Sequence, residues 1–223
     1  MKHKIVALLA GLILASGLQA EVMVKDTFAL STERTKAAEL DGAKSEVGGA
    51  TWMADKGLVF AGDVGNGYLT MTPPQDRVFC AKVKVPADMG DVIIVQGDVQ
   101  PSKSGWVAVG IGEGGLIWKN GLFLLVEPSG NSQRIYCDDS GTTKSLPLQS
   151  TGKAKVKTDA LNTLKLQYDK KANLVSMWLN DEPVLKDFHL DTLHFKPVTT
   201  YAGFSGYGQG AEVKLDNFII AKP

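Results

Sequence analysis

The sequence predicts an all-β fold in which two antiparallel sheets stack as a jelly-roll sandwich. Short segments that alternate between apolar and polar residues recur along the chain, turn residues separate them, and glycine is abundant at 24 of 223 residues. Many short strands with glycine-rich turns are typical of sandwiches and barrels rather than of βαβ units. No repeat, linker or change of composition divides residues 21–223, so we expect one β-sandwich domain there.

The first 20 residues have the three parts of a secretory signal peptide. Two lysines lie within Met1–Lys4, an almost unbroken apolar run extends from Ile5 to Leu18, and small residues end at Ala20. The apolar run has 14 residues, whereas a transmembrane helix needs about 20. We therefore predict a signal peptide over residues 1–20, cut after Ala20 or after Gly17, and a secreted or periplasmic protein without a membrane span.

The charge of the remaining chain excludes some partners. Two of the 24 basic residues lie in the leader, which leaves 22 basic and 24 acidic groups after cleavage. A net charge near −2 gives no electrostatic attraction to nucleic acid or to an anionic membrane. We expect neither as a partner.

Alternation of side chains and β-branched apolar runs predict nine strands. They cover residues 77–85, 92–99, 106–111, 122–127, 133–137, 163–168, 174–179, 201–207 and 212–220. In the third segment, Val107, Val109 and Ile111 share one face and leave Trp106 on the other.

One further segment, Thr32–Leu40, has a helical pattern with Ser31 as its N-cap. We also expect Trp52 and Trp178 to lie in the core of the sandwich, because tryptophan is highly buried on average.

The two cysteines, Cys80 and Cys137, allow two interpretations. Export permits a disulfide between them. Cys137 shares a face with Ile135, whereas Cys80 alternates with Phe79, which has the character of a core residue. Two cysteines are enough for one disulfide, but their presence does not show that they lie close together. A disulfide and two separate buried thiols therefore both stay open as interpretations.

Several segments of the chain have the character of a known superfamily. They are Asp26-Thr27-Phe28, Gly105-Trp106-Val107-Ala108-Val109-Gly110, Trp118-Lys119-Asn120-Gly121-Leu122, Leu164–Asp169 with Val175–Asn180, and Ala202-Gly203-Phe204 with Asp216-Asn217-Phe218. Together they resemble the concanavalin A-like lectin/glucanase superfamily, on its laminin-G-like side, in the form common in secreted bacterial proteins. The resemblance implies a jelly roll with adjacent first and last strands. It implies no activity, because that fold hosts lectins, hydrolases, lyases and adhesion modules.

The enzymes of this superfamily have motifs that the chain lacks. Its glucanases use a Glu-x-Asp-x-x-Glu strand, and retaining hydrolysis needs two carboxyls about 5 Å apart. Asp138-Asp139 and Asp181-Glu182 are instead adjacent acids that point to opposite faces or lie in turns. Tyr201–Gln209 resembles one strand of the alginate lyases, but the Gln-x-His strand is missing, because Gly97-Asp98 follows Gln96. We therefore expect no catalytic residues.

Aromatic residues outside the expected core are the remaining signal. Trp106 and Trp118 combine with the shared face of Arg134, Tyr136 and Asp138 to offer flat apolar surfaces and hydrogen-bonding groups. Sugar recognition uses both kinds of group. These five residues and the groove aromatic Tyr207 are the candidate ligand-binding set. The alternative is that the tryptophans only pack.

We expect no cofactor, and the alternative that the sequence best supports is a structural calcium ion. Asp26 and Asp216 would meet if the terminal strands pair, and their carboxylates are suitable calcium ligands. The alternative is that these short polar side chains cap turns.

The sequence therefore favours an exported, non-catalytic carbohydrate-binding module whose partner is a polysaccharide or another glycan. One alternative is a glycoside hydrolase or polysaccharide lyase on the same fold. The other is a structural or protein-interaction domain of the cell envelope.

Overall fold

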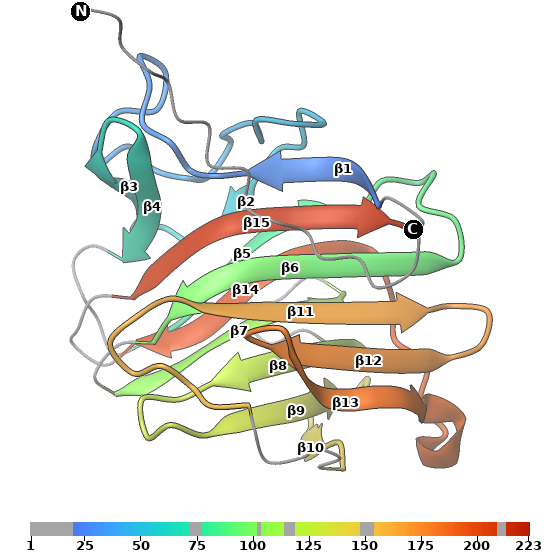
Figure 1. The fold of residues 1–223 in the computed structure, drawn as a ribbon. Helices are drawn as coiled ribbons and strands as arrows, with labels where there is room; N and C mark the ends of the chain where they lie inside the picture. Colours follow the sequence, from blue (N-terminus) through green and yellow to red (C-terminus); the bar gives the residue numbers. More distant parts are fainter. Residues whose placement is uncertain (1–19, 72–76, 102–103, 114–118, 148–153, 209–212) are drawn as a thin grey trace, which may run out of the picture.

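The computed structural model describes residues 20–71, 77–101, 104–113, 119–147, 154–208 and 213–223. Its strands form two antiparallel sheets that lie one behind the other (Figure 1). The predicted jelly-roll sandwich is confirmed in this architecture. The predicted signal peptide lies outside the described residues except for Ala20, and Trp118 lies outside them as well.

The first sheet contains eight strands. Their order is β13 (Glu182–His189), β12 (Leu174–Leu179), β11 (Asn162–Asp169), β6 (Val92–Gln100), β15 (Lys214–Lys222), β4 (Asn66–Met71) and β3 (Leu58–Asp63), and β1 (Glu21–Asp26) pairs with β15. The first and last strands are thus adjacent, as the family resemblance implies.

The second sheet contains seven strands. Their order is β10 (Thr143–Ser145), β9 (Ser132–Cys137), β8 (Gly121–Val126), β7 (Gly105–Gly112), β14 (Tyr201–Gly208), β5 (Arg77–Lys84) and β2 (Met53–Ala54). A short 3₁₀ helix, η1 (Leu190–Leu193), follows β13. No helix in the described ranges combines the length and the hydropathy that a membrane crossing requires.

All nine predicted strands are present, and their ends agree with the prediction to within two residues. The structure adds six strands that the sequence did not predict, namely β1, β2, β3, β4, β10 and β13. The β3–β4 hairpin turns through Val64 and Gly65, and Gly65 has a φ of 88°, which suits glycine.

The predicted helix over Thr32–Leu40 is wrong, because this segment consists of bends and turns. The Ser31 hydroxyl does accept a hydrogen bond from the Arg34 N–H at 3.1 Å, as an N-cap would. The backbone then bonds across the chain instead of along a helix, since the Ala37 N–H donates to the Phe60 carbonyl at 2.8 Å. Pairing with β3 has overridden the weak helical pattern.

The core between the sheets is built around a cluster of aromatic rings. Trp52 is fully buried, and its ring stacks on Phe204 at a centroid distance of 6.4 Å and meets Phe218 at 5.1 Å. Gly97 makes room for this cluster, because a β-carbon there would lie 2.5 Å from the Phe204 ring. The core assignment of Trp52 is confirmed.

The core assignment of Trp178 is wrong. This residue lies opposite Lys165 in the β11–β12 register, on the outward face of the first sheet, and it is half-buried. The Nζ atom of Lys165 lies 4.8 Å from the centroid of its ring, which is a cation–π contact. Alternation contained the signal, because Val175, Met177 and Leu179 share the buried face and leave Trp178 on the other.

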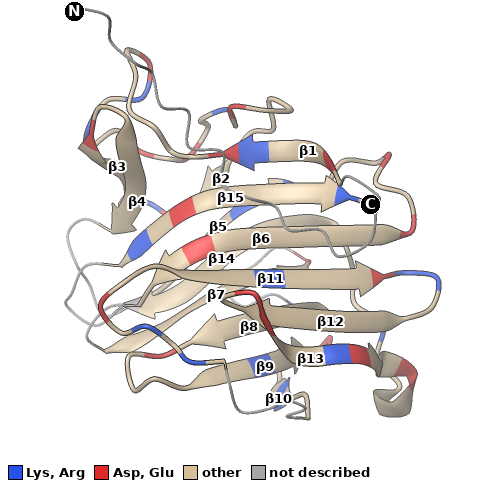
Figure 2. Cartoon of the chain, viewed as in Figure 1, with Lys and Arg blue, Asp and Glu red and all other residues tan. Residues whose placement is uncertain are grey.

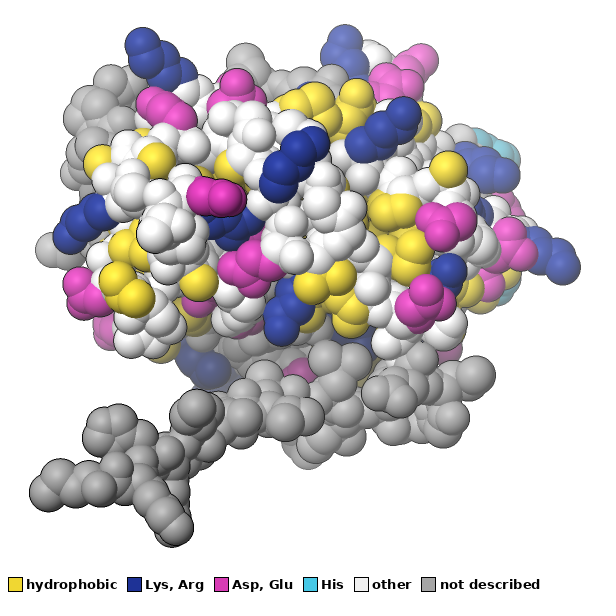
Figure 3. All heavy atoms as spheres, turned by 90° about the horizontal axis from the view of Figure 1, so that it is seen from above, with side chains coloured by type: hydrophobic (Ala, Val, Ile, Leu, Met, Phe, Trp, Pro, Cys, Tyr) yellow, Lys and Arg dark blue, Asp and Glu magenta, His cyan; other side chains and the backbone are white. Residues whose placement is uncertain are grey.

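Charged residues occur on both sheets and in the loops (Figure 2). On the face seen from above, Lys and Arg side chains are interspersed with Asp and Glu (Figure 3). That face therefore presents no region in which all charges have the same sign.

Candidate binding site on the outer face of the second sheet

The outward faces of the two sheets differ in polarity. An antiparallel sheet with one face in water usually places polar side chains on that face. In the first sheet, β11 follows this rule, because Thr163, Lys165 and Gln167 point outward. In the second sheet, β8 instead presents Phe123 and Leu125 outward, and both are buried. The outer face of the second sheet is thus apolar although the first sheet does not cover it.

The outward apolar residues of the second sheet form a hydrophobic cluster separate from the core. Its buried members are Cys80, Ala108, Phe123, Leu125 and Cys137, and Trp106, Ile135 and Tyr201 pack against them. A second apolar cluster on an outward face calls for an explanation beyond the folding of the sandwich.

A hollow of about 320 Å³ opens in this cluster, and we call it the outer-sheet hollow. Trp106, Ala108, Phe123, Leu125, Glu127, Gln133, Ile135, Thr143 and Ser205 line it. Its size and its largely apolar lining with a few polar groups match the usual features of small-molecule sites.

Small side chains on two adjacent strands produce the hollow. Ala108 and Gly110 on β7 lie in register with Ser205 and Gly203 on β14. These four residues leave the centre of the face low. On the other side of β7, Phe123 leans over Gly110, where a β-carbon would lie 2.8 Å from its ring. The sheet is therefore shallow along β7 and β14 and raised along β8.

The polar groups of the hollow lie at its two sides. Ser205 is only 1% exposed, and its Oγ atom has no hydrogen-bond partner among the described residues. At the other side, the Gln133 side-chain amide donates to Glu127 Oε1 at 2.7 Å. Ser205, Ala108, Leu125 and Gln133 form one register row across β14, β7, β8 and β9.

Two of the predicted ligand-binding residues lie on this face. Trp106 lines the hollow. Tyr207 lies directly opposite Trp106 in the β7–β14 register. Both side chains are half-buried. The structure therefore brings Trp106 and Tyr207 together, a pairing that the sequence did not indicate.

Arg134 and Tyr136 point the other way. They share a face, as their spacing indicates, but that face packs into the interior, where the Tyr136 ring lies 4.8 Å from Phe195. Arg134 is 8% exposed and lies opposite the buried Leu124. Burial lowers the pKa of its guanidinium. The structure thus separates Arg134 and Tyr136 from Trp106.

Asp138 organises the turn between β9 and β10. Its Oδ1 atom accepts hydrogen bonds from the backbone N–H groups of Ser140 and Thr142 at 3.1 and 3.0 Å. Its Oδ2 atom lies 3.1 Å from Lys144 Nζ. The hydrogen bond from Ser140, followed by those from Lys144 and Thr142, lowers the pKa of Asp138 to about 2.

Both cysteines are free thiols. Three strands separate β5 from β9, so about 19 Å lies between the two backbones. A disulfide needs α-carbons less than about 7 Å apart. The structure therefore answers the question of a Cys80–Cys137 bridge in favour of two separate buried thiols. Burial raises the pKa of the Cys80 thiol to about 12 and raises that of Cys137.

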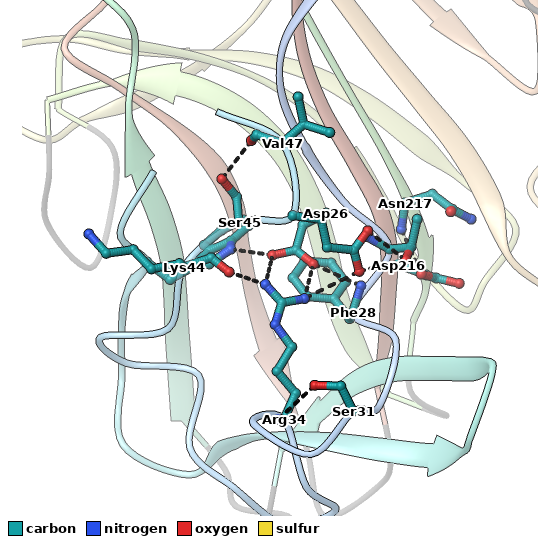
Figure 4. Close-up of polar contacts among 12 residues, drawn as sticks. Asp26, Phe28, Ser31, Arg34, Lys44, Ser45, Val47, Asp216 and Asn217 are labelled. Carbon is teal, nitrogen blue, oxygen red and sulfur yellow. Dashed lines mark hydrogen bonds and ion pairs between the residues drawn. The ribbon is translucent and has the colours of Figure 1, made fainter. Parts of the chain in front are cut away.

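The pairing of β1 with β15 places Asp26 close to Asp216 (Figure 4). Asp26 is fully buried, and its carboxylate accepts from Arg34 at 2.6 and 3.0 Å and from the Trp52 indole at 2.8 Å. Protein donors thus occupy both of its oxygens. Among the residues placed by the structure, no group of three or more His, Cys, Asp or Glu side chains is arranged to hold a metal. The structural calcium stays a prediction.

Asp98 and Asp216 lie opposite each other in the β6–β15 register, and Figure 2 shows acidic positions side by side on these two strands. The Asn217 side-chain amide donates to Asp98 at 2.8 Å, and the Asn217 backbone N–H donates to Asp216 at 2.7 Å. Burial raises the pKa of Asp216 to about 7, and the negative charges of Asp98, Glu46 and Asp26 add to this effect. The sequence analysis missed this carboxyl pair, because it depends on strand order.

No known protein-family model matches the chain, and no curated protein sequence matches it significantly. Solved structures do resemble its fold. A protein of unknown function with a galectin-like fold from Bacillus subtilis has a TM-score of 0.53 and 16% identity, over 92% of this chain and 98% of that one. The receptor-binding domain of botulinum neurotoxin type G has a TM-score of 0.53 and 11% identity, and a sialidase has 0.52 and 10%.

These similarities define the class of fold, a β-sandwich similar to the galectin-like type. The alignment covers 90% of this chain and 47% of the neurotoxin domain structure, and 77% of this chain and 17% of the sialidase. The chain therefore spans less than half the length of either structure. At identities this low the similarity shows the fold alone. The narrower concanavalin A-like and laminin-G-like assignment stays a prediction.

The sequence analysis missed most of the residues that line the hollow. The signal was present as small residues at alternate positions, Ala108 and Gly110 in one segment and Gly203 and Ser205 in another. Side chains two residues apart share a face of a strand. Two such segments in neighbouring strands indicate a depression in the sheet, but the sequence does not show that the strands are neighbours.

Proposed function

We propose that this protein is a carbohydrate-binding module that holds part of a glycan in the outer-sheet hollow. The contrast between the two outward faces carries the proposal, because the outward face of the second sheet is apolar and hollowed whereas that of the first sheet is polar along β11. A ligand that fills the hollow would shield from water the apolar surface that Trp106 and Ile135 still expose.

The chemistry of the hollow suits a sugar ring. Trp106 and Tyr207 provide adjacent aromatic surfaces for the apolar faces of a pyranose. Glu127 and Gln133 supply carboxylate and amide oxygens that accept hydrogen bonds from sugar hydroxyls. The site thus combines an apolar platform with a few directional polar groups, as carbohydrate recognition requires.

The proposal includes export and the absence of catalysis. Export is supported by the three-part leader over residues 1–20, and it places the protein in the periplasm or outside the cell. Binding without catalysis is supported by the lining of the hollow, in which Glu127 is the one carboxylate among the described residues. Glycosidic hydrolysis by the usual mechanisms uses a pair.

Trp106→Ala tests the proposal, and Trp178→Ala is a matched control. Both tryptophans are half-buried on an outward face, but Trp178 lies on the first sheet. We expect Trp106→Ala to weaken binding to the recognised polysaccharide at least tenfold in affinity electrophoresis, and Trp178→Ala to leave it unchanged. Equal losses in the two variants, at matched melting temperatures, would place the glycan elsewhere.

The enzyme alternative is favoured by one observation, the carboxyl pair of Asp98 and Asp216. Two carboxyl groups on neighbouring strands, of which one has its pKa raised to about 7, resemble the acid pair of a glycosidase. The pair lies on the first sheet, however, whereas the hollow lies on the second. Release of reducing sugar or unsaturated uronate from a polysaccharide panel, lost in Asp216→Asn, would establish this alternative.

Capture of an envelope protein without any glycan binding would favour an interaction domain.

A further inference from the structure

The outer-sheet hollow offers a single buried hydrogen-bonding group on an otherwise apolar floor. Ala108, Phe123 and Leu125 are buried and carry only carbon atoms toward the hollow. Ser205 lies among them, and its hydroxyl has no partner in the described part of the chain. A ligand group that enters here must therefore be apolar except for one atom that bonds to Ser205.

A plain hexose does not meet this requirement. It carries hydroxyls on most of its ring carbons, and several of them would be buried against Ala108 and Leu125 without partners. An acetamido substituent does meet it. Its methyl group is apolar, and its carbonyl oxygen accepts one hydrogen bond, which the Ser205 hydroxyl is free to donate. Its N–H is attached to the sugar ring and therefore stays at the ring end of the group, away from the apolar floor.

The dimensions of the hollow fit an acetamido group that is attached to a sugar ring. Ser205 and Gln133 lie in one register row, three strand spacings apart, so about 14 Å separates their backbones. A substituent at Ser205 leaves room for the ring above Leu125. The ring hydroxyls then come within reach of Gln133 and of the Glu127 carboxylate beside it.

The charges around the hollow favour an uncharged sugar. Glu127 is the one ionisable side chain among its described lining residues. Its carboxylate disfavours uronates and other anionic sugars nearby. Lys82 lies on the same face of β5, but its Nζ atom already lies 4.8 Å from the centroid of the Tyr201 ring.

Resting on the proposed function, we infer that the recognised glycan contains N-acetylated amino sugars. The acetamido methyl packs on Ala108 and Leu125, and the acetamido carbonyl accepts a hydrogen bond from Ser205. The inference assigns to Ser205 a specificity-determining role that explains why an unpartnered hydroxyl is buried in an apolar face.

The test compares acetylated sugars with their parent sugars. N-acetylglucosamine, N-acetylgalactosamine, glucose, galactose and glucuronate are titrated into the purified, isotopically labelled protein, and binding is followed by NMR chemical shifts. We expect at least one acetylated sugar to bind ten times more tightly than its parent and glucuronate to bind least. The shifted resonances should include those of Ala108 and Leu125.

Ser205→Ala provides the second arm. It removes a buried hydroxyl without a partner, so we expect a melting temperature no lower than that of the wild type and a loss of about tenfold in the acetyl preference. Ser145→Ala is the control, because Ser145 is exposed on β10 opposite Ile135 and does not line the hollow. We expect it to bind like the wild type.

The outcomes separate the two proposals. Parent sugars that bind as well as acetylated sugars, with shifts in the hollow, would overturn the inference and leave the proposed function intact. An acetyl preference that Ser205→Ala leaves unchanged would overturn the role of Ser205. No binding by any sugar or polysaccharide would overturn the proposed function and the inference with it.

Discussion

Replacing Asp216 by asparagine should change how the stability of the protein depends on pH. Burial raises the pKa of Asp216 from 3.8 to about 7, and Asp98, Glu46 and Asp26 contribute negative charge around it. In the unfolded chain the carboxyl has an ordinary pKa near 3.9. At a pH between these two pKa values, the folded protein binds a proton at Asp216 that the unfolded chain releases.

The sign of the effect follows from this difference. Where the folded state binds more protons, the free energy of unfolding falls as the pH rises. The stabilising contribution of protonated Asp216 is thus fully present below about pH 4 and is lost as the pH rises through about 7. At 1.36 kcal/mol for each pKa unit, the loss has an upper limit of about 4 kcal/mol.

Urea denaturation followed by tryptophan fluorescence at pH 5 and pH 8 measures the effect. Asp216→Asn cannot ionise, so its free energy of unfolding lacks this contribution to the pH dependence. We expect the difference between variant and wild type to shift by about 2–3 kcal/mol in favour of the variant between the two pH values. Asp91→Asn, at an exposed acid just before β6, is the control and should show no such shift. A difference for Asp216→Asn that stays constant to within about 0.5 kcal/mol would refute the reasoning.

Two other predictions concern the core and the thiols. Arg34→Met should lower the free energy of unfolding by about 3–5 kcal/mol in urea, because it leaves the fully buried carboxylate of Asp26 without its cation, and adding Asp26→Asn should restore part of the loss. A loss below about 1 kcal/mol would mean that water reaches the pair. Cys80 and Cys137 should both react with a thiol reagent in denaturant without reductant, and neither should react quickly in the folded protein. A disulfide in the protein isolated without reductant would contradict the strand order.

Strong alternation allowed the strands to be predicted, and β11 illustrates why. Leu164, Leu166 and Tyr168 are fully buried, while Lys165 and Gln167 between them point outward. The pattern determines both the strand and its inner face, because a slip of one residue would expose the whole apolar set.

The orientation of β9 could not be predicted in the same way. Ile135 and Cys137 alternate with Arg134 and Tyr136, so each face of the strand contains residues that could be buried. The odd or even position of a residue along the strand determines which side chains share a face, but not which face points inward. The neighbouring strand β8 gives no help, because it is apolar on both faces. Only the packing of the two sheets shows that Ile135 points outward.

The hollow depends on information that a single strand does not contain. Ser205 and Gln133 belong to segments that are distant in sequence, and they meet in one register row because β14, β7, β8 and β9 are neighbours in that order. Strand order and register come from long-range pairing, which local patterns do not encode. The same limit applies to the pairing of Trp106 with Tyr207.

Three departures from the usual rules of folding coincide at the outer-sheet hollow. Apolar residues point outward, small residues leave the sheet unfilled, and the Ser205 hydroxyl is buried without a partner. Two other buried side-chain atoms among the described residues lack partners, on Thr70 and Arg134, but neither residue lines the hollow. Each departure alone lowers stability, and real proteins concentrate such departures where function requires them. Their coincidence around Ser205 is therefore better explained by a ligand than by the folding of the sandwich.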